Sequence, residues 1–153
     1  MDKLNLPAYS FTIKKASNNK LYIFDAIRKK SILLTPEEWV RQHLIRFLIE
    51  EKEFPASLIS IESGIKVNQL ARRYDALVYN RQGNPILLIE CKAPSVKINQ
   101  DTFDQILAYN RRVQASYLIV SNGMNHYCCK INPDTRKFDF LEDIPIYRNL
   151  SDE

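Results

Sequence analysis

Two strand-like runs separated by a short glycine-containing loop constrain the fold of this chain more than any other part of its sequence. Residues 73–80 and 85–92 are rich in β-branched, aromatic and other apolar side chains, and residues 81–84 between them include a glycine. A four-residue loop with glycine between two such runs is typical of a β-hairpin. If residues 81–84 form the loop, Asn80 faces Pro85, and this pairing sets the register of the hairpin.

Charged side chains interrupt both runs of this hairpin. The register places Asp75 opposite Glu90, and Lys92, two residues beyond Glu90, lies on the same face. Charges inside such strands are costly unless they are paired or bind an ion, and two facing carboxylates repel each other. A bound Mg²⁺ or Mn²⁺ would remove this repulsion, because these ions prefer oxygen ligands. The two carboxylates and the lysine therefore provide the groups needed for metal-assisted phosphodiester hydrolysis.

The rest of the sequence predicts helices and strands on both sides of the hairpin. Thr35, Pro36 and Glu38 are typical of a helix start, with Glu38 completing a capping box, and apolar residues at helical spacing continue to about Glu50. A second helix is predicted over 101–112. The other strands are predicted at 9–14, 20–25, 30–34, 58–62, 116–121 and 126–130.

This order of elements predicts an α/β fold with a central mixed β-sheet flanked by helices. A strand, helix and strand in succession after the hairpin loop require a right-handed crossover, which makes the two strands parallel. We expect a single domain over residues 1–153. Its α-β-β-β-α-β core covers about 36–130, and residues 1–34 form an N-terminal β-ribbon extension.

Composition excludes several classes of protein. The 153 residues are 45% hydrophobic and 26% charged, as in a globular domain rather than a disordered or fibrous chain. The net charge of +4 is compatible with a nucleic acid partner, although many other proteins share it. An odd number of cysteines, no signal-peptide pattern and no membrane-length apolar run predict a cytoplasmic protein without a membrane partner. With three glycines and no phosphate-binding loop, we expect no ATP-driven motor in this chain.

The charged residues of the hairpin match a known pattern. Asp75 followed by fourteen residues and then Glu90, Cys91 and Lys92 resembles the PD-(D/E)XK nuclease signature, with Tyr74 in place of the usual proline. The closer resemblance is to the N-terminal nuclease domain of type I restriction enzyme R subunits and its short relatives. The stretches that carry it are, in order, 36–41, 72–75, 88–94, 105–110 and 121–123. The resemblance implies a restriction-endonuclease-like fold and a metal-dependent DNA endonuclease.

The resemblance also implies roles for individual residues. Asp75, Glu90 and the main-chain carbonyl of Cys91 would hold Mg²⁺ or Mn²⁺, and Lys92 would be the catalytic lysine. Relatives carry a glutamate on the first helix near the metal, and two residues compete for this role here. We prefer Glu37 to Glu38, because Glu37 lies on the helix face that carries Val40 and Leu44. Gln105 and Tyr109 resemble the Q-x3-Y motif of many relatives, where the amide could position the lysine, a water or a phosphate.

Paired arginines suggest how a nucleic acid would bind. Arg72, Arg73, Arg111 and Arg112 flank the expected site in the sequence, so we expect phosphate contacts from them, with DNA as the partner. Many such nucleases cut duplexes as dimers, which leaves a homodimer open.

Other interpretations of these residues stay open. The same fold could be a catalytically silent nucleic-acid-binding or regulatory module, and the charged residues of the hairpin could form a purely structural ion-pair cluster. A zinc site at His126, Cys128 and Cys129 is disfavoured, because the chain has no Cys-x-x-Cys pair and only one other histidine. These three residues instead fit a late strand.

Overall fold

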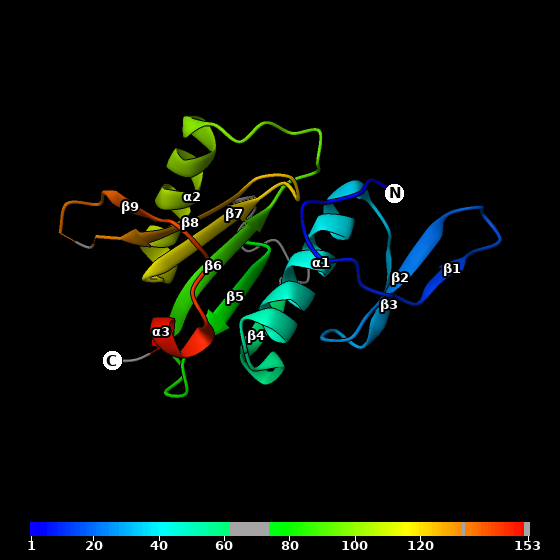
Figure 1. The fold of residues 1–153 in the computed structure, drawn as a ribbon, viewed down its shortest axis with the longest axis horizontal. Coiled ribbons are helices and arrows are strands. Elements are labelled where there is room, and N and C mark those ends of the chain that lie inside the picture. Colours follow the sequence, from blue (N-terminus) through cyan, green and yellow to red (C-terminus); the bar gives the residue numbers. More distant parts are fainter. Residues whose placement is uncertain (62–73, 133, 152–153) are drawn as a thin grey trace.

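The structure, a computed structural model, describes residues 1–61, 74–132 and 134–151. It contains two β-sheets, with helices on both faces of the larger one (Figure 1). In chain order the elements are β1 (Ile13–Lys15), β2 (Leu21–Asp25), β3 (Lys30–Leu33), α1 (Pro36–Glu51), the short 3-10 helix η1 (Ala56–Leu58), β4 (Ile59–Ile61), β5 (Ala76–Tyr79), β6 (Pro85–Cys91), α2 (Gln100–Val113), β7 (Tyr117–Ser121), β8 (His126–Ile131), β9 (Phe138–Leu141) and α3 (Tyr147–Ser151).

The larger sheet is mixed, as the sequence predicts. Its strand order is β4-β5-β6-β7-β8-β9, and β6 and β7 are parallel while the other neighbours are antiparallel. The parallel pair is joined by α2, which is the predicted crossover. Every residue of β6 after Pro85 is buried, because this strand is covered on both faces.

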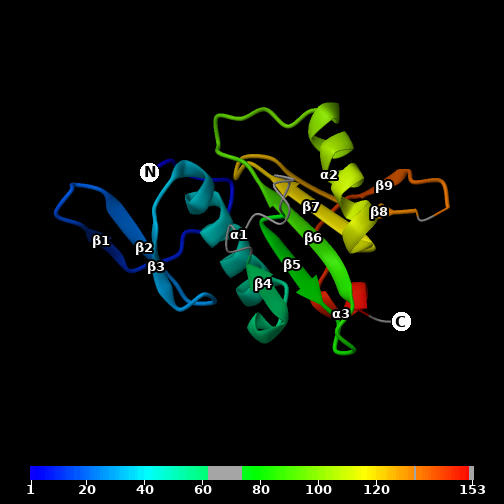
Figure 2. The ribbon, with the colours of Figure 1, turned by 180° about the vertical axis from the view of Figure 1, so that it is seen from behind.

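Helices cover the two faces of this sheet and bury two apolar clusters. One cluster joins α1 and α3 to the sheet through residues such as Leu44, Leu87 and Tyr147. The other joins α2 to the opposite face through residues such as Phe103 and Leu88. Figure 2 shows α1 and α2 on different sides of the strands, so the main body has three layers.

The hairpin of β5 and β6 has the predicted register near its open end and a different one near its loop. Leu77 faces Leu88 as predicted, but a bulge pairs Tyr79 with Pro85 in place of the predicted partner Asn80. Asn80 instead closes the loop, where its side chain accepts hydrogen bonds from the main chain of residues 82 and 84. The extra residue is Ile86, which packs on the α1 side of the sheet.

The predicted N-terminal ribbon is a separate antiparallel sheet of order β1-β2-β3. It lies beside α1, on the side away from the six-stranded sheet (Figures 1 and 2). The segment that leads into it places the ring of Phe11 against Trp39 and His43 of α1, with centroid distances of 6.0 and 4.9 Å. The ribbon is thus held by contacts with α1.

Two elements near the C-terminus are absent from the sequence prediction. Strand β9 extends the sheet beyond β8, and α3 packs Tyr147 and Leu150 into the cluster under α1. Tyr147 also donates a hydrogen bond from its hydroxyl to the carbonyl of Tyr79, at 2.9 Å. Within the described part of the chain, no helix is long and apolar enough to cross a membrane.

Candidate active site

Glu90 and Lys92 lie where the central strand β6 ends. Glu90 is 6% exposed, and its carboxylate oxygen is 3.0 Å from the Nζ atom of Lys92. Lys92 is fixed at its backbone, because its N–H donates to the carbonyl of Ser121 at the end of β7, at 2.8 Å. This ion pair is consistent with the prediction that Glu90 and Lys92 share one face of the strand.

Asp75 is buried immediately before β5, and its carboxylate is fully engaged. One oxygen accepts a hydrogen bond from the N–H of Cys91 at 2.6 Å, and the other pairs with the guanidinium of Arg41 on α1. The β5–β6 ladder ends at Ala76, one residue short of the predicted pairing of Asp75 with Glu90. The backbone N–H of Asp75 still donates to the carbonyl of Ile89 on β6 at 3.0 Å, while its carboxylate meets these two donors.

Arg41 is a site residue that the sequence reasoning missed. Its guanidinium contacts both Glu38 and Asp75, and its side chain is 14% exposed. Burial lowers the pKa of Arg41, but the charges of Asp75 and Glu38 outweigh burial and leave it above its ordinary value. Its Nε atom is buried and has no hydrogen-bond partner among the described residues. The available signal was helical spacing, since Arg41 follows Glu37 by one turn.

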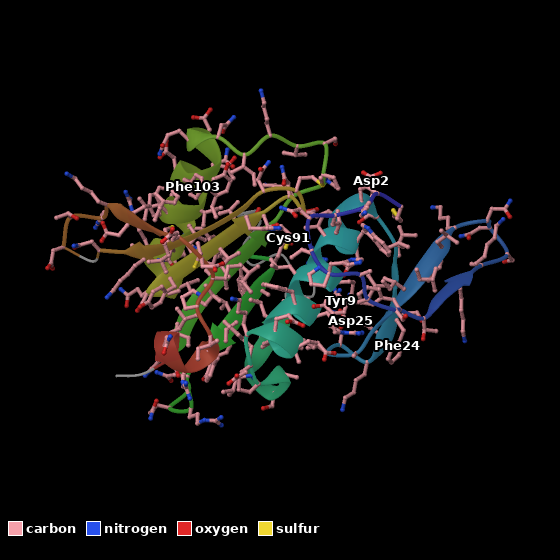
Figure 3. All side chains as sticks on the ribbon, in the orientation of Figure 1. Asp2, Tyr9, Phe24, Asp25, Cys91 and Phe103 are labelled. Carbon is pink, nitrogen blue, oxygen red and sulfur yellow. The ribbon has the colours of Figure 1, made fainter. Side chains whose placement is uncertain are left out.

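The contacts of Arg41 extend into a line of alternating charges that reaches the ribbon. Glu38 also accepts a hydrogen bond from Arg28 at 2.8 Å, and Arg28 pairs with Asp25 at the end of β2. We call Asp25, Arg28, Glu38, Arg41 and Asp75 the ion-pair chain. Figure 3 labels Asp25 near the ribbon and Cys91, the hydrogen-bond partner of Asp75, near the sheet. The ion-pair chain therefore connects the ribbon to the end of the hairpin through α1.

The two glutamates of the first helical turn have different surroundings. Glu37 is half-buried, and burial followed by the charge of Asp75 raises its pKa, although Arg41 and Lys92 act in the opposite direction. Glu37 is therefore close enough to the predicted site for these charges to act on it. Glu38 contributes only half of the predicted capping box: its N–H donates to the side chain of Thr35 at 3.0 Å, while its carboxylate belongs to the ion-pair chain.

The predicted Q-x3-Y residues lie on α2 with different exposure. The ring of Tyr109 contacts the ring of Tyr74, which precedes Asp75, at a centroid distance of 6.0 Å. Gln105 is exposed, and no hydrogen bond within the described residues joins its amide to Lys92. The structure thus brings Tyr109 close to the site and leaves Gln105 on the surface of the helix.

The predicted arginine pair of α2 does not lie beside the site. Arg111 and Arg112 are exposed in the last turn of α2, which leads into the amino end of β7, whereas Lys92 contacts the carboxyl end of β7. Arg111 lines a cavity of about 480 Å³ there, together with residues such as Arg136. Arg72 and Arg73 lie outside the described residues.

The groups at the end of β6 suit a hard cation by their chemistry. Asp75, Glu90 and the carbonyl of Cys91 offer oxygen atoms, which are the ligands that Mg²⁺ and Mn²⁺ prefer. Burial raises the pKa of the Cys91 thiol well above its ordinary value, which keeps the thiol neutral. Within the described residues, no three His, Cys, Asp or Glu side chains are grouped to hold a metal by themselves. The predicted set needs only two carboxylates and a carbonyl.

The late-strand interpretation of the cysteines agrees with the packing of β8. Cys128 and Cys129 are buried in the two different clusters, one on each face of the sheet. The Nδ1 atom of His126 lies 2.7 Å from the hydroxyl of Ser121, and its Nε2 atom lies 2.8 Å from the carbonyl of Asn5. These three residues therefore do not converge on one point.

Comparisons with known proteins agree with this fold. Residues 36–145 match the family described as the type I restriction enzyme R protein N terminus. A solved fragment of a protein described as an HsdR subunit of a type I restriction enzyme from Vibrio vulnificus is similar in structure, with a TM-score of 0.52 and 19% identity. The match covers 76% of this chain and 24% of that one, so this chain spans about a quarter of the matched protein. No curated protein matches this sequence.

Proposed function

Because the chain belongs to the type I restriction enzyme R protein N-terminus family, we propose that it is a metal-dependent DNA endonuclease of the PD-(D/E)XK type. The single observation that supports this most is that Asp75 accepts a hydrogen bond from the N–H of Cys91 while Glu90 pairs with Lys92, so both carboxylates have partners at the last residues of β6 and just beyond. On α1, Arg41 pairs with Asp75, and Glu37 is close enough for the charges of Asp75 and Lys92 to act on it. A binding module has no need for buried carboxylates that would repel phosphate.

In this proposal the carboxylates and one carbonyl hold the metal. Asp75, Glu90 and the main-chain carbonyl of Cys91 are its ligands, and Glu37 adds negative charge beside them. Bound Mg²⁺ or Mn²⁺ would supply a Lewis acid for the phosphate and lower the pKa of a bound water. The cost of burying Asp75 is already met by the N–H of Cys91 and by Arg41, so the carboxylate is fixed before any ligand arrives.

Lys92 acts on the water and the phosphate. Its ammonium lies 3.0 Å from the carboxylate of Glu90, and its backbone N–H donates to the carbonyl of Ser121. These two contacts restrain both ends of the residue. From there the ammonium can orient the attacking water and stabilise negative charge that develops on the phosphate. Tyr109 and Gln105 follow on α2, where they would contact the substrate or position the water.

The test is nicking of supercoiled plasmid by the purified protein. We expect nicking with Mg²⁺ or Mn²⁺ and none with EDTA. Lys92→Ala should lose at least 10²-fold of the rate, because a positioned acid–base group typically contributes 10²–10⁴-fold. The matched control is Lys130→Ala, since Lys130 is an exposed lysine that pairs with Tyr117 at the other end of β7.

The control decides what the result means. Equal rates for wild type and Lys92→Ala would indicate a contaminating nuclease and contradict the proposal. A loss in both lysine variants would indicate a general effect of charge on DNA binding. Unchanged circular dichroism of Lys92→Ala is needed to show that the variant is folded.

A catalytically silent DNA-binding module is the second candidate, and one observation favours it. Asp75 is paired with Arg41, and Glu90 with Lys92, so the acidic groups have cationic partners within the protein itself. Such pairing could stabilise the domain without any metal. Metal-independent DNA binding without nicking would support this candidate. A homodimer is part of neither candidate and is tested by measuring the mass in solution.

A further inference from the structure

We propose that Arg41 is a stand-in cation, which neutralises Asp75 while the site is empty of metal and leaves that carboxylate when a divalent ion binds. This inference rests on the proposed function, because it concerns the same metal ligand. It assigns to Arg41 a positioning role. The residue would act through Asp75 and would not contact the reacting atoms.

The guanidinium of Arg41 is paired with the carboxylate that the proposed metal would use. Asp75 gives one oxygen to the N–H of Cys91, so its other oxygen, paired with Arg41, is the one a cation would compete for. A guanidinium and a divalent ion on the same carboxylate repel each other, and this repulsion is strong where water is scarce. Asp75 is 9% exposed, so metal binding and the Arg41 pair oppose each other.

Arg41 has a second carboxylate partner, Glu38, for its charge. Its other terminal nitrogen already pairs with Glu38, which is 3% exposed and is itself held by Arg28 and Gln42. Arg41 can therefore release Asp75 without becoming an unpaired buried charge, which is the costly outcome of breaking most buried ion pairs.

The guanidinium of Arg41 does not use all of its hydrogen-bond donors in its present position. The buried Nε donor of Arg41 has no acceptor within the described residues, and an unmet donor of this kind is normally costly. A fixed structural arginine would be expected to use this donor. An arginine that alternates between a metal-free and a metal-bound arrangement can be held in the metal-free one by its terminal nitrogens alone.

The experiment compares Mn²⁺ binding and melting temperature in wild type and Arg41→Gln. We expect the variant to melt at a lower temperature in EDTA, because Asp75 loses its cation, and to bind Mn²⁺ several-fold more tightly by calorimetry. Mn²⁺ should then raise its melting temperature by more than it raises that of wild type. The matched control is Arg46→Gln on the same helix, where the guanidinium stacks on Phe11 at 4.8 Å and has no contact with Asp75.

A second measurement uses the unaltered protein, in case Arg41→Gln does not fold. The guanidinium ¹⁵N signals of Arg41 should show restricted rotation without metal and freer rotation after Mg²⁺ is added. Signals that do not change while Mg²⁺ binds would overturn the proposal.

The outcomes separate this inference from the nuclease proposal. Equal or weaker Mn²⁺ binding by Arg41→Gln, with wild type binding the ion, overturns the stand-in role and leaves the metal site intact. No Mn²⁺ binding by wild type or by Arg41→Gln overturns both. Tighter binding by Arg41→Gln, with Arg46→Gln unchanged, supports the inference.

Discussion

At the scale of single residues, the charged form of Glu37 is expected to destabilise the metal-free protein, and a neutral side chain at this position should remove that effect. Its pKa is raised by burial and by Asp75, so its charged form is disfavoured in the folded state. A raised pKa gives stability that is present below the ordinary value of 4.5 and lost as the pH rises. We therefore expect Glu37→Gln in EDTA to melt above wild type at pH 7, with the difference shrinking below pH 4.5.

Melting curves of both proteins between pH 4 and pH 8 check this expectation. Arg41 and Lys92 favour the charged form of Glu37, whereas burial and Asp75 disfavour it. The difference in melting temperature measures which of these effects is larger. A variant that melts below wild type at pH 7 would show that Glu37 is mainly an ion-pair partner of these cations. In that case its place as an additional acid of the metal site would lose its support.

The sequence pointed to three candidate site residues and did not point to Arg41, for a physical reason. Asp75, Glu90 and Lys92 stand out because charges inside apolar strands are unusual, and this pattern is local. Arg41 does not stand out, because a charged residue on a helix is ordinary and its partner Asp75 is 34 positions away. Pairing between distant residues becomes visible only when the helix is packed on the sheet.

At the scale of elements, α1 connects the two sheets, and His43 lies where it meets the N-terminal segment. The ring packs against Trp39 and Phe11, and burial lowers its pKa below the ordinary value of 6.5. A lowered pKa gives stability that is present above the ordinary value and lost as the pH falls. We expect the free energy of unfolding to decrease as the pH falls below 6.5, and His43→Gln to lack that part of the decrease.

Urea unfolding at several pH values above and below 6.5 measures this slope. His43→Gln also loses packing at all pH values, so the slope and not the absolute stability is the test. The control is the same substitution at His126, the other histidine of the chain, whose ring nitrogens contact Ser121 and Asn5. A His43→Gln slope equal to that of wild type would assign the pH dependence to another group.

Elements were predicted from sequence where their signals are local. Thr35 and Pro36 give the start of α1, and hydrophobic periodicity gives α2. The bulge in the hairpin was missed, because it depends on how Asn80 closes the loop. Strand β9 was missed as well. The alternation of Phe138 and Phe140 covers too few residues to indicate a strand in the sequence.

At the scale of the whole molecule, the mixed character of the sheet followed from the order of elements, but the position of the ribbon did not. Handedness rules fix the crossover through α2. The ribbon precedes residues 36–145, which match the family, and its place depends on the ion-pair chain and on the contacts of Phe11. These contacts join segments that no pattern within either segment connects.

In the proposed function, the candidate active site and the arginines of α2 lie in different parts of the molecule. The carboxyl end of β6 leads through residues 92–99 to the start of α2. Arg111 lies in the last turn of that helix. From the start of α2 to Arg111 is about 16 Å, at about 1.5 Å per residue of helix. A duplex lying along α2 would span about five base pairs between the first residue of the helix and Arg111, at about 3.4 Å per base pair.

We therefore expect Arg111→Ala/Arg112→Ala to weaken binding of a long duplex without lowering the cleavage rate at saturating DNA. Each lost phosphate contact should flatten the slope of log affinity against log salt by about 0.9. Arg148→Ala is the matched control, because Arg148 is exposed on α3, which packs on the opposite face of the sheet from α2. An unchanged salt slope would remove both arginines from the DNA interface. A lower rate at saturating DNA would mean that they act on the site itself and would contradict this prediction.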